Sequence, residues 1–373
     1  MPRIPCTMHI MPPIDALRIS AFTIPTETEE QDGTIEWDST TLVLVEAEAG
    51  GATGLGYTYA SRAAATVIAD TLKAGLVGRS AMNIQGAWEA MCAAVRNIGQ
   101  PGLAAEAISA VDSALWDLKA RLLGLPLVSL LGAVRDTLPV YGSGGFTNYS
   151  PGRLEEQMGG WARDGLRYVK MKVGRDAVAD RDRVSLVRNA IGPCAALFVD
   201  ANGAYTRKQA LAQAGAFAEN TVSWFEEPVS SDDLEGLHLI RDAAPPGMDI
   251  AAGEYGYHAG YFRRMLAVGA VDVLQADATR CGGITGFLQA AALCEAHHLP
   301  LSSHCAPALH AHLGCAVSSM VHAEYFFDHA RVENMLFDGA LEPCRGALAP
   351  DLSRPGNGLA VKRADAERFR IHL

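Results

Sequence analysis

Short apolar runs recur along the last two thirds of the chain, and this recurrence limits its fold more than any other feature. From Leu138 onward eight runs follow one another at intervals of roughly 25 to 30 residues, with helical patterns between them. The runs are LPVYGS, RYVKMKV, ALFVDAN, VSWFEEP, DIAAGE, VDVLQAD, PLSSH and VHAEYFF. Eight buried strands that alternate with helices favour a parallel (β/α)8 barrel of the α/β class.

The preceding part of the chain has a different pattern, typical of an α+β unit. Residues 14–59 contain the alternating stretch ALRISAFTIP and then TTLVLVEAEAGGATGLGYTYA, a strand, a glycine turn and a second strand. Helical patterns follow over residues 61–78, 83–99 and 103–124. We therefore expect an N-terminal domain over 1–135, a barrel over 136–345 and a tail, about 346–373, that packs back on the first domain.

An acidic, turn-rich segment, TETEEQDGTIEWD at residues 26–38, separates the two strand patterns and has no apolar periodicity. We expect a solvated loop here, or a mobile lid, because such loops often close over substrate sites. Further candidates for substrate specificity, whose individual roles the sequence leaves open, are Tyr57, Tyr59, Tyr141, Arg280 and His310. His310 and His312 are two residues apart, cannot share a helix face, and are expected to be structural or substrate-lining.

The net charge and the cysteines exclude several classes of protein. A formal charge of −11 disfavours nucleic acid and anionic membranes as partners. The sequence contains no run of about 18 apolar residues, and its N-terminal stretch lacks the apolar core of a signal peptide. Eight cysteines, from Cys6 to Cys344, form no CxxC pair. We expect reduced thiols in a cytoplasmic protein rather than a disulfide framework or a zinc site.

Three acidic residues end neighbouring expected strands: Asp200 in FVDAN, Glu226 in WFEEP and Glu254 in AAGE. They are 26 and 28 residues apart, one βα unit each, so parallel strands would bring them together at one rim of the barrel. Converging anions repel one another unless a cation neutralises them, and hard oxygen ligands favour Mg²⁺. Glu227 is expected to face away, solvated or paired. The alternative is three unrelated acids in surface loops.

Further ionisable residues end the other expected strands. Lys170 and Lys172 in VKMKV share one strand face, and near a divalent cation the pKa of a lysine falls so that it can act as a base. Asp277 and His304 end adjacent runs, so the carboxylate can hold one ring nitrogen and turn the other toward a substrate. Glu324, if protonated, could donate a hydrogen bond to an oxyanion. Each residue alone also fits an ordinary structural role.

Together these motifs resemble the enolase superfamily and, within it, the mandelate racemase subgroup of the mandelate racemase/muconate lactonizing enzyme family. The resemblance covers nearly the whole chain. Its pieces are ISAVDSALWDLKARLLGLPLVSLLG in the first domain, then KMK, DAN, FEEP, GE, DATRCGGITG, SSH and HAEYF in the barrel. The muconate-lactonizing subgroup has a lysine at the end of the sixth strand, where this chain has ADATRCGG, so that subgroup fits less well.

The resemblance implies an α+β capping domain, formed by the N-terminal part and the C-terminal tail, over a modified (β/α)7β TIM barrel. It implies Mg²⁺ on the three acids and removal of the proton α to a substrate carboxylate, which gives a metal-stabilised enediolate. Lys172 is implied as one base, and His304, oriented by Asp277, as the other on the opposite face. Lys170 would steady the substrate carboxylate, and Glu324 would be the electrophilic donor.

The implied enzyme is a lyase or an isomerase, and the enediolate has several fates. We favour dehydration of a sugar acid, an aldonate or aldarate, to a 2-keto-3-deoxy acid, because polyhydroxy acids are the commonest substrates that the subgroup implies. The alternatives are a racemase or epimerase of a 2-hydroxy acid and a cycloisomerase. A non-catalytic binding barrel would predict damaged bases or ligands, which the sequence does not show. The resemblance also implies a symmetric homo-oligomer, often an octamer, whereas the acid itself and the subunit number stay open.

Overall fold

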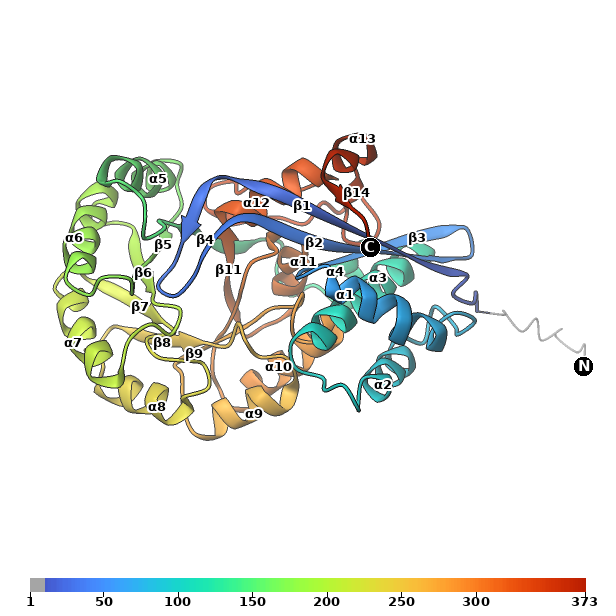
Figure 1. Ribbon diagram of the computed structural model, residues 1–373, viewed down its shortest axis with the longest axis horizontal. Helices are drawn as coiled ribbons and strands as arrows, with labels where there is room; N and C mark the ends of the chain where they lie inside the picture. The colour runs from blue at the N-terminus through green and yellow to red at the C-terminus, as the bar shows by residue number, and fades with distance from the viewer. Residues whose placement is uncertain (1–10) are drawn as a thin grey trace, which may run out of the picture.

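A computed structural model describes residues 11–373, so the expectations about Cys6 and the first ten residues lie outside the described part. Within it, eight parallel strands form a barrel, and pairing of the last strand with the first closes it (Figure 1). The strands are β4 (Leu138–Gly144), β5 (Tyr168–Lys172), β6 (Ala196–Asp200), β7 (Val222–Glu226), β8 (Asp249–Ala252), β9 (Val273–Ala276), β10 (Leu301–Ser303) and β11 (Met320–Phe326). The barrel predicted from the apolar runs is confirmed.

Helices lie between successive barrel strands and cover the outside of the barrel (Figure 1). Local signals set where some of them begin: the Ser150 hydroxyl accepts a hydrogen bond from the Arg153 N–H at 3.4 Å, and Thr206 forms a capping box with Gln209. The helices are α5 (Pro151–Arg163), α6 (Ala179–Ile191), α7 (Arg207–Ala218), α8 (Leu234–Ala243), α9 (Ala259–Ala267), α10 (Gly283–Ala296) and α11 (Pro307–Ala316). This is the (β/α)7β order, and α12 (Phe327–Leu336) follows the last strand.

The N-terminal part forms an antiparallel sheet with helices packed against it, as predicted. The sheet has the order β15-β1-β2-β3, in which β15 (Arg370–Ile371) from the end of the chain pairs with β1. Its other elements are β1 (Ala16–Gln31), β2 (Glu36–Ala49), β3 (Ala52–Tyr59), α1 (Ala63–Val67), a π-helical turn (Ile68–Leu72), a 3₁₀ turn (Lys73–Gly75), α2 (Ile84–Ala94), α3 (Leu103–Leu122) and α4 (Leu127–Leu131). The domain boundaries at 135 and 345 stay a prediction.

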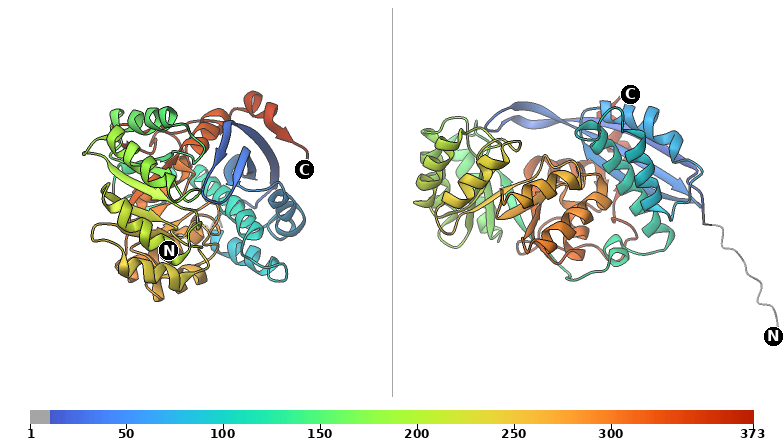
Figure 2. Two further views of the ribbon diagram at one scale, coloured as in Figure 1. Left: turned by 60° about the vertical axis from the view of Figure 1, so that its left-hand side comes forward. Right: turned by 90° about the horizontal axis from the view of Figure 1, so that it is seen from below.

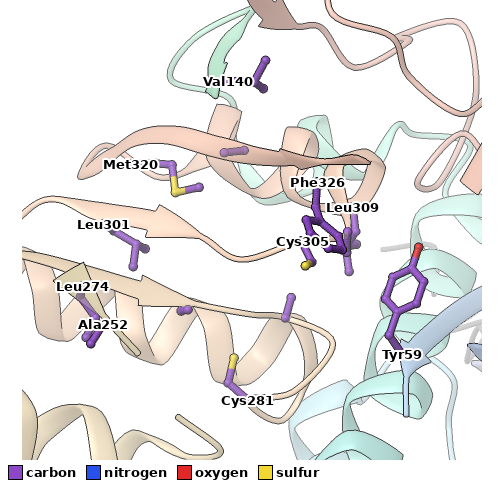
Figure 3. Close-up of a cluster of buried hydrophobic side chains, with 14 of the residues drawn as sticks. Tyr59, Val140, Ala252, Leu274, Cys281, Leu301, Cys305, Leu309, Met320 and Phe326 are labelled. Atoms are coloured by element: carbon purple, nitrogen blue, oxygen red, sulfur yellow. The ribbon is translucent and has the colours of Figure 1, made fainter. Parts of the chain in front are cut away.

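Short elements complete the C-terminal segment, and apolar side chains fill the space between the layers. These elements are β12 (Phe337–Asp338), β13 (Ala347–Leu348), β14 (Ala360–Val361), α13 (Arg363–Ala366) and a 3₁₀ turn (Glu367–Phe369). Figure 3 shows part of the core, in which Leu274, Leu301 and Met320 come from three successive strands of the barrel. No helix in residues 11–373 is long and apolar enough to cross a membrane.

The acidic segment 26–38 is not the irregular loop that its composition predicts. Strands β1 and β2 continue through it as a hairpin, with Glu30 opposite Trp37 and a turn between Asp32 and Ile35. Glu30 is buried and accepts a hydrogen bond from Trp37 Nε1 at 2.9 Å, so a contact across the hairpin offsets the low strand propensity of the acid. The hairpin reaches over the barrel (Figure 2), where Thr147 N–H donates to the Gln31 carbonyl at 2.8 Å.

Polar residues of α3 hold the N-terminal domain against the barrel. The Ser109 hydroxyl accepts hydrogen bonds from the N–H groups of Gly282 and Gly283, at 2.9 and 3.0 Å, and Asp112 accepts from the N–H and hydroxyl of Thr285. These N–H groups lie at the start of α10, where the helix itself offers them no partner. Gly283 has φ +83°, and an added Cβ would lie 2.3 Å from Asp112 Oδ2, so the contact requires glycine here.

Substitution of Gly56 by alanine tests the close approach of β3 to α3. A Cβ at Gly56 would lie 2.1 Å from the Ala110 carbonyl oxygen and 2.3 Å from Ala114 N, both backbone atoms that cannot move aside cheaply. We expect Gly56→Ala to lower the free energy of unfolding in urea by about 1–3 kcal/mol or more. Gly75→Ala, with no atom near the added Cβ, is the control. Equal unfolding midpoints for the two variants would contradict this packing.

Candidate functional site

The three acids predicted as metal ligands meet at the carboxyl ends of the barrel strands. Asp200 and Glu226 are the last residues of β6 and β7 and lie opposite each other in the register, and Glu254 follows β8 by two residues. All three are buried, and one oxygen from each lies within 4.8 Å of the others. The one-unit spacing in the sequence therefore corresponds to a real cluster of carboxylates.

The donor set of this cluster fits a hard divalent cation such as Mg²⁺. All three donors are carboxylates, and Glu254 Oε2 has no hydrogen-bond partner among residues 11–373 although it is buried. Burial raises the pKa of Glu226 well above its ordinary value, and the nearby charge of Asp200 raises it further. A bound cation would lower the pKa of Glu226 again, because it stabilises the ionised carboxylates.

Lys170 and Lys172 lie on the same face of β5 and pair with these carboxylates. Lys172 Nζ is 2.6 Å from Asp200 Oδ2, and Lys170 Nζ is 2.6 Å from Glu226 Oε1. Burial opposes the charged form of Lys172, but Asp200 and Glu254 outweigh it and hold its pKa above the usual range. The lowered lysine pKa expected from the sequence is thus not a property of these side chains alone. It requires a cation that neutralises the acids.

His304 and Asp277 form the predicted pair on the other side of the site. His304 Nδ1 donates to Asp277 Oδ2 at 2.8 Å, and the other ring nitrogen, Nε2, lies 3.2 Å from Cys305 Sγ and 3.4 Å from Glu254 Oε2. Asp277 is fixed in turn, because its Oδ1 accepts from the N–H and the hydroxyl of Thr279 at 2.6 and 2.8 Å. Burial alone would raise the pKa of Asp277, but the hydrogen bond and charge of His304 hold it below its usual range, so the carboxylate stays ionised.

Glu324 lies between the two sides. Its Oε1 is 2.8 Å from Lys170 Nζ, and its Oε2 accepts a hydrogen bond from the Cys305 N–H at 2.8 Å. Burial alone would raise the pKa of Glu324, but Lys170 holds it well below the ordinary value. Glu324 is therefore ionised in this arrangement, and the protonated donor inferred from the sequence stays a prediction.

Glu227 is buried, so it is not the solvated side chain that the sequence allowed. It is 1% exposed, and its Oε1 has no hydrogen-bond partner within the described part of the chain. Burial raises the pKa of Glu227 well above its ordinary value, and Glu254 raises it further. Glu227 follows β7 with φ +38°, which is not a strand conformation, so the alternation of strand side chains does not predict where its carboxyl group lies.

A cavity of about 170 Å³ lies between the barrel rim and the hairpin of the N-terminal domain. The hairpin supplies part of its wall and the barrel supplies the ionisable groups. The lining residues are Asp32, Ile35, Trp37, Thr40, Lys172, Asn202, Glu254, Tyr255, Arg280, His304, Cys305, Glu324, Phe326 and His329. A small polar molecule in this cavity would contact both proposed bases and, of the three clustered acids, Glu254.

Several of these cavity residues were not singled out from the sequence. Asn202 stands in the DAN motif and Cys305 directly follows His304, so their positions beside predicted site residues were an available signal. His329 carried no comparable signal. It follows the last strand, and its ring stacks on Tyr59 with the centroids 3.4 Å apart.

The candidates for specificity separate into two groups. Arg280 lines the cavity, and Tyr59 lies behind His329, whereas Tyr57, Tyr141 and His310 are buried outside the cavity wall. The Tyr57 hydroxyl donates to Glu333 at 2.5 Å, and Tyr141 packs among aromatic rings inside the barrel. In His310 and in His312 both ring nitrogens form hydrogen bonds with backbone groups, so these histidines are structural.

Comparisons with known proteins agree with this fold. Residues 153–366 match the family described as enolase C-terminal domain-like, and residues 28–132 match the mandelate racemase/muconate lactonizing enzyme N-terminal domain. A 3,6-anhydro-α-L-galactonate cycloisomerase of Streptomyces coelicolor is 34% identical over 95% of this chain and 98% of its own.

Two solved structures extend the similarity. A mandelate racemase/muconate lactonizing enzyme-like protein of Rubrobacter xylanophilus is 54% identical, with TM-score 0.95 over 96% of this chain and 100% of its own. An L-talarate dehydratase of a Polaromonas species, solved with Mg and L-glucarate, is 32% identical, with TM-score 0.88 over 97% of this chain and 98% of its own.

Removal of one acid of the cluster should weaken binding of Mg²⁺. We expect Asp200→Asn to raise the dissociation constant for Mg²⁺, measured by isothermal titration calorimetry, by at least about tenfold, since even residues that only orient ligands typically contribute 10–100-fold. The control is Glu333→Gln, which changes a buried carboxyl that binds Tyr57 instead. Unchanged affinity in Asp200→Asn would place the cation elsewhere.

Proposed function

Because the chain belongs to the mandelate racemase/muconate lactonizing enzyme family of the enolase superfamily, we propose that it dehydrates a sugar acid. In this reaction the enzyme removes the proton α to the carboxylate, expels the β-hydroxyl as water and releases a 2-keto-3-deoxy acid. The enzyme is thus of the lyase or isomerase type, and its proposed substrate is an aldonate or aldarate. The observation that carries the proposal is a pair of separate proton acceptors, Lys172 and the Asp277-held His304, that line one cavity beside the acids.

The acids and the lysines give the cavity its charge balance. Asp200, Glu226 and Glu254 would hold Mg²⁺, and the bound cation would supply positive charge next to the substrate carboxylate, where negative charge builds up as the α proton leaves. Together with Lys170 the cation would offset the three acids, so that an anionic substrate can enter a protein of charge −11 while Lys172 is neutral and able to act as a base.

The chain's own residues perform the proton transfers in this proposal. Lys172 takes the α proton, and it can do so because the cation on the acids lowers its pKa. His304 Nε2 serves as acid toward the β-hydroxyl, with Asp277 stabilising the charged ring through Nδ1. Lys170 turns from Glu324 to the substrate carboxylate, and Glu324, then free to carry a proton, donates a hydrogen bond to the developing enediolate.

Cycloisomerisation is the second candidate, since the cycloisomerase of Streptomyces coelicolor is similar over nearly the full length of both chains. It uses a proton transfer α to a carboxylate as well, but opens or closes a ring instead of releasing water. Racemisation of a 2-hydroxy acid needs the same two opposed bases. The product formed, rather than the residues, distinguishes these reactions.

We further propose that the enzyme acts in the cytoplasm as a symmetric oligomer, such as an octamer. The free thiols of the seven cysteines in residues 11–373 support a reducing compartment. Light scattering after size-exclusion chromatography measures the number of subunits.

A screen of acid sugars tests the proposed reaction. With Mg²⁺ present, we expect at least one aldonate or aldarate to give a 2-keto acid, detected with semicarbazide, and to exchange its α proton in D₂O, detected by NMR. A cyclic product without a keto group would favour the cycloisomerase, and exchange without net product the racemase. Failure of every acid to exchange or react would reject proton abstraction as the activity.

Substitution of each proposed base tests the assignment. We expect Lys172→Ala and His304→Asn each to lower turnover by about 10²–10⁴-fold, the usual contribution of a general acid or base. Lys208→Ala and His297→Asn, which change the same residue types at exposed positions, serve as matched controls. Wild-type turnover in either active-site variant would remove that residue from the mechanism.

A further inference from the structure

A second group of side chains with metal-binding donor atoms lies in the cavity beside the cluster of acids, with His304 Nε2 3.4 Å from Glu254 Oε2. His304, Cys305 and Glu324 are all buried, and one donor atom from each lies within 4.8 Å of the others. We propose that these three residues form a site for zinc or another thiophilic divalent cation, and that its occupation blocks His304. The site differs from the acid cluster in its chemistry, because it offers a nitrogen and a sulfur beside one carboxylate.

The distance between two of the donors suits a zinc ion. Cys305 Sγ lies 3.2 Å from His304 Nε2. Zinc binds sulfur at about 2.3 Å and nitrogen at about 2.0–2.1 Å, so tetrahedral coordination places the two atoms about 3.5 Å apart. A shift of a few tenths of an ångström therefore admits the ion. The left-handed backbone at Cys305, with φ +51°, turns the chain directly after β10 and brings the two consecutive residues to one place.

The surroundings already orient the donors, as second-shell groups do in zinc sites. Asp277 holds His304 Nδ1–H, so the lone pair of the neutral ring is on Nε2, the atom beside the sulfur. The Cys305 N–H holds Glu324 Oε2 at 2.8 Å, and this contact fixes the carboxylate next to the thiol. Three protein donors leave a fourth position, which water or the nearby Glu254 Oε2 can fill.

The two sites should take different cations. The acid cluster has only oxygen donors and favours Mg²⁺, whereas a thiolate and an imidazole favour softer ions such as Zn²⁺. Binding at the second site releases one proton, from Cys305 Sγ to solvent, since a coordinating thiol is deprotonated. Glu324 must give up its contact with Lys170, which keeps Glu226 as a partner at 2.6 Å.

Binding at this site has a consequence for catalysis. The ion would occupy Nε2 of His304, the atom that the proposed function uses for proton transfer. We therefore expect micromolar zinc to inhibit turnover in the presence of excess Mg²⁺, and a chelator to restore it. Only the inhibition rests on the proposed function, since metal binding is measured without substrate.

Cobalt substitution tests the binding directly. In excess Mg²⁺, addition of Co²⁺ to the wild-type enzyme should give the near-ultraviolet charge-transfer absorption of a cobalt–thiolate bond, which an all-oxygen site cannot produce. We expect Cys305→Ser to lose this absorption, and Cys294→Ala, which removes another buried thiol, to keep it. Asp200→Asn, altered in the acid cluster, should keep it too.

A second measurement needs no variant. X-ray absorption of the wild-type enzyme loaded with one zinc ion in excess Mg²⁺ should show one sulfur neighbour at about 2.3 Å. A zinc coordination shell of oxygen and nitrogen atoms without sulfur would overturn the proposal. So would the absence of the cobalt absorption in the wild-type enzyme, or its persistence in folded Cys305→Ser. Where Cys305→Ser is active, its zinc sensitivity should fall by at least about tenfold, and equal sensitivity would overturn the proposed inhibition.

Discussion

The structure depends on the burial of opposite charges at one end of the barrel. Asp200, Glu226 and Glu254 cannot gather away from water without positive charge close by, and Lys170 and Lys172 supply part of it at 2.6 Å. Two unit charges 4 Å apart interact by about 4 kcal/mol at an effective dielectric constant of 20. Loss of one partner therefore leaves an uncompensated charge, and this interdependence keeps the acids and bases in a fixed arrangement.

The N-terminal domain completes this arrangement, although it supplies neither metal ligand nor base. The hairpin of β1 and β2 forms one wall of the cavity through Asp32 and Trp37, and α3 is held to the start of α10 by Ser109 and Asp112. The loop before α10 carries Arg280, so the same contact that joins the domains also positions a charged residue of the cavity. Exclusion of water by the hairpin strengthens the electrostatic interactions inside.

In each of the proposed reactions the same residues control charge and protons, not the fate of the carbon skeleton. Lys172 ends β5 and His304 directly follows β10, and in the proposed reactions they act on different faces of a substrate. Cys305 adds a feature that the proton-transfer scheme does not use, a thiol against His304 Nε2. The cavity thus combines a hard-cation site with donors for a soft cation.

The sequence by itself determined the barrel, the capping sheet and the cluster of acids. Strand ends that are one βα unit apart meet at one rim of a barrel, whatever the sequence of the helices and loops between them. It also placed His304 beside Asp277 by the same rule. Only the tertiary structure decided what depends on contacts between distant segments. The acidic stretch 26–38 became a hairpin because Trp37 and the barrel gave it partners, and Glu227 is buried where the packing around the end of β7 encloses it.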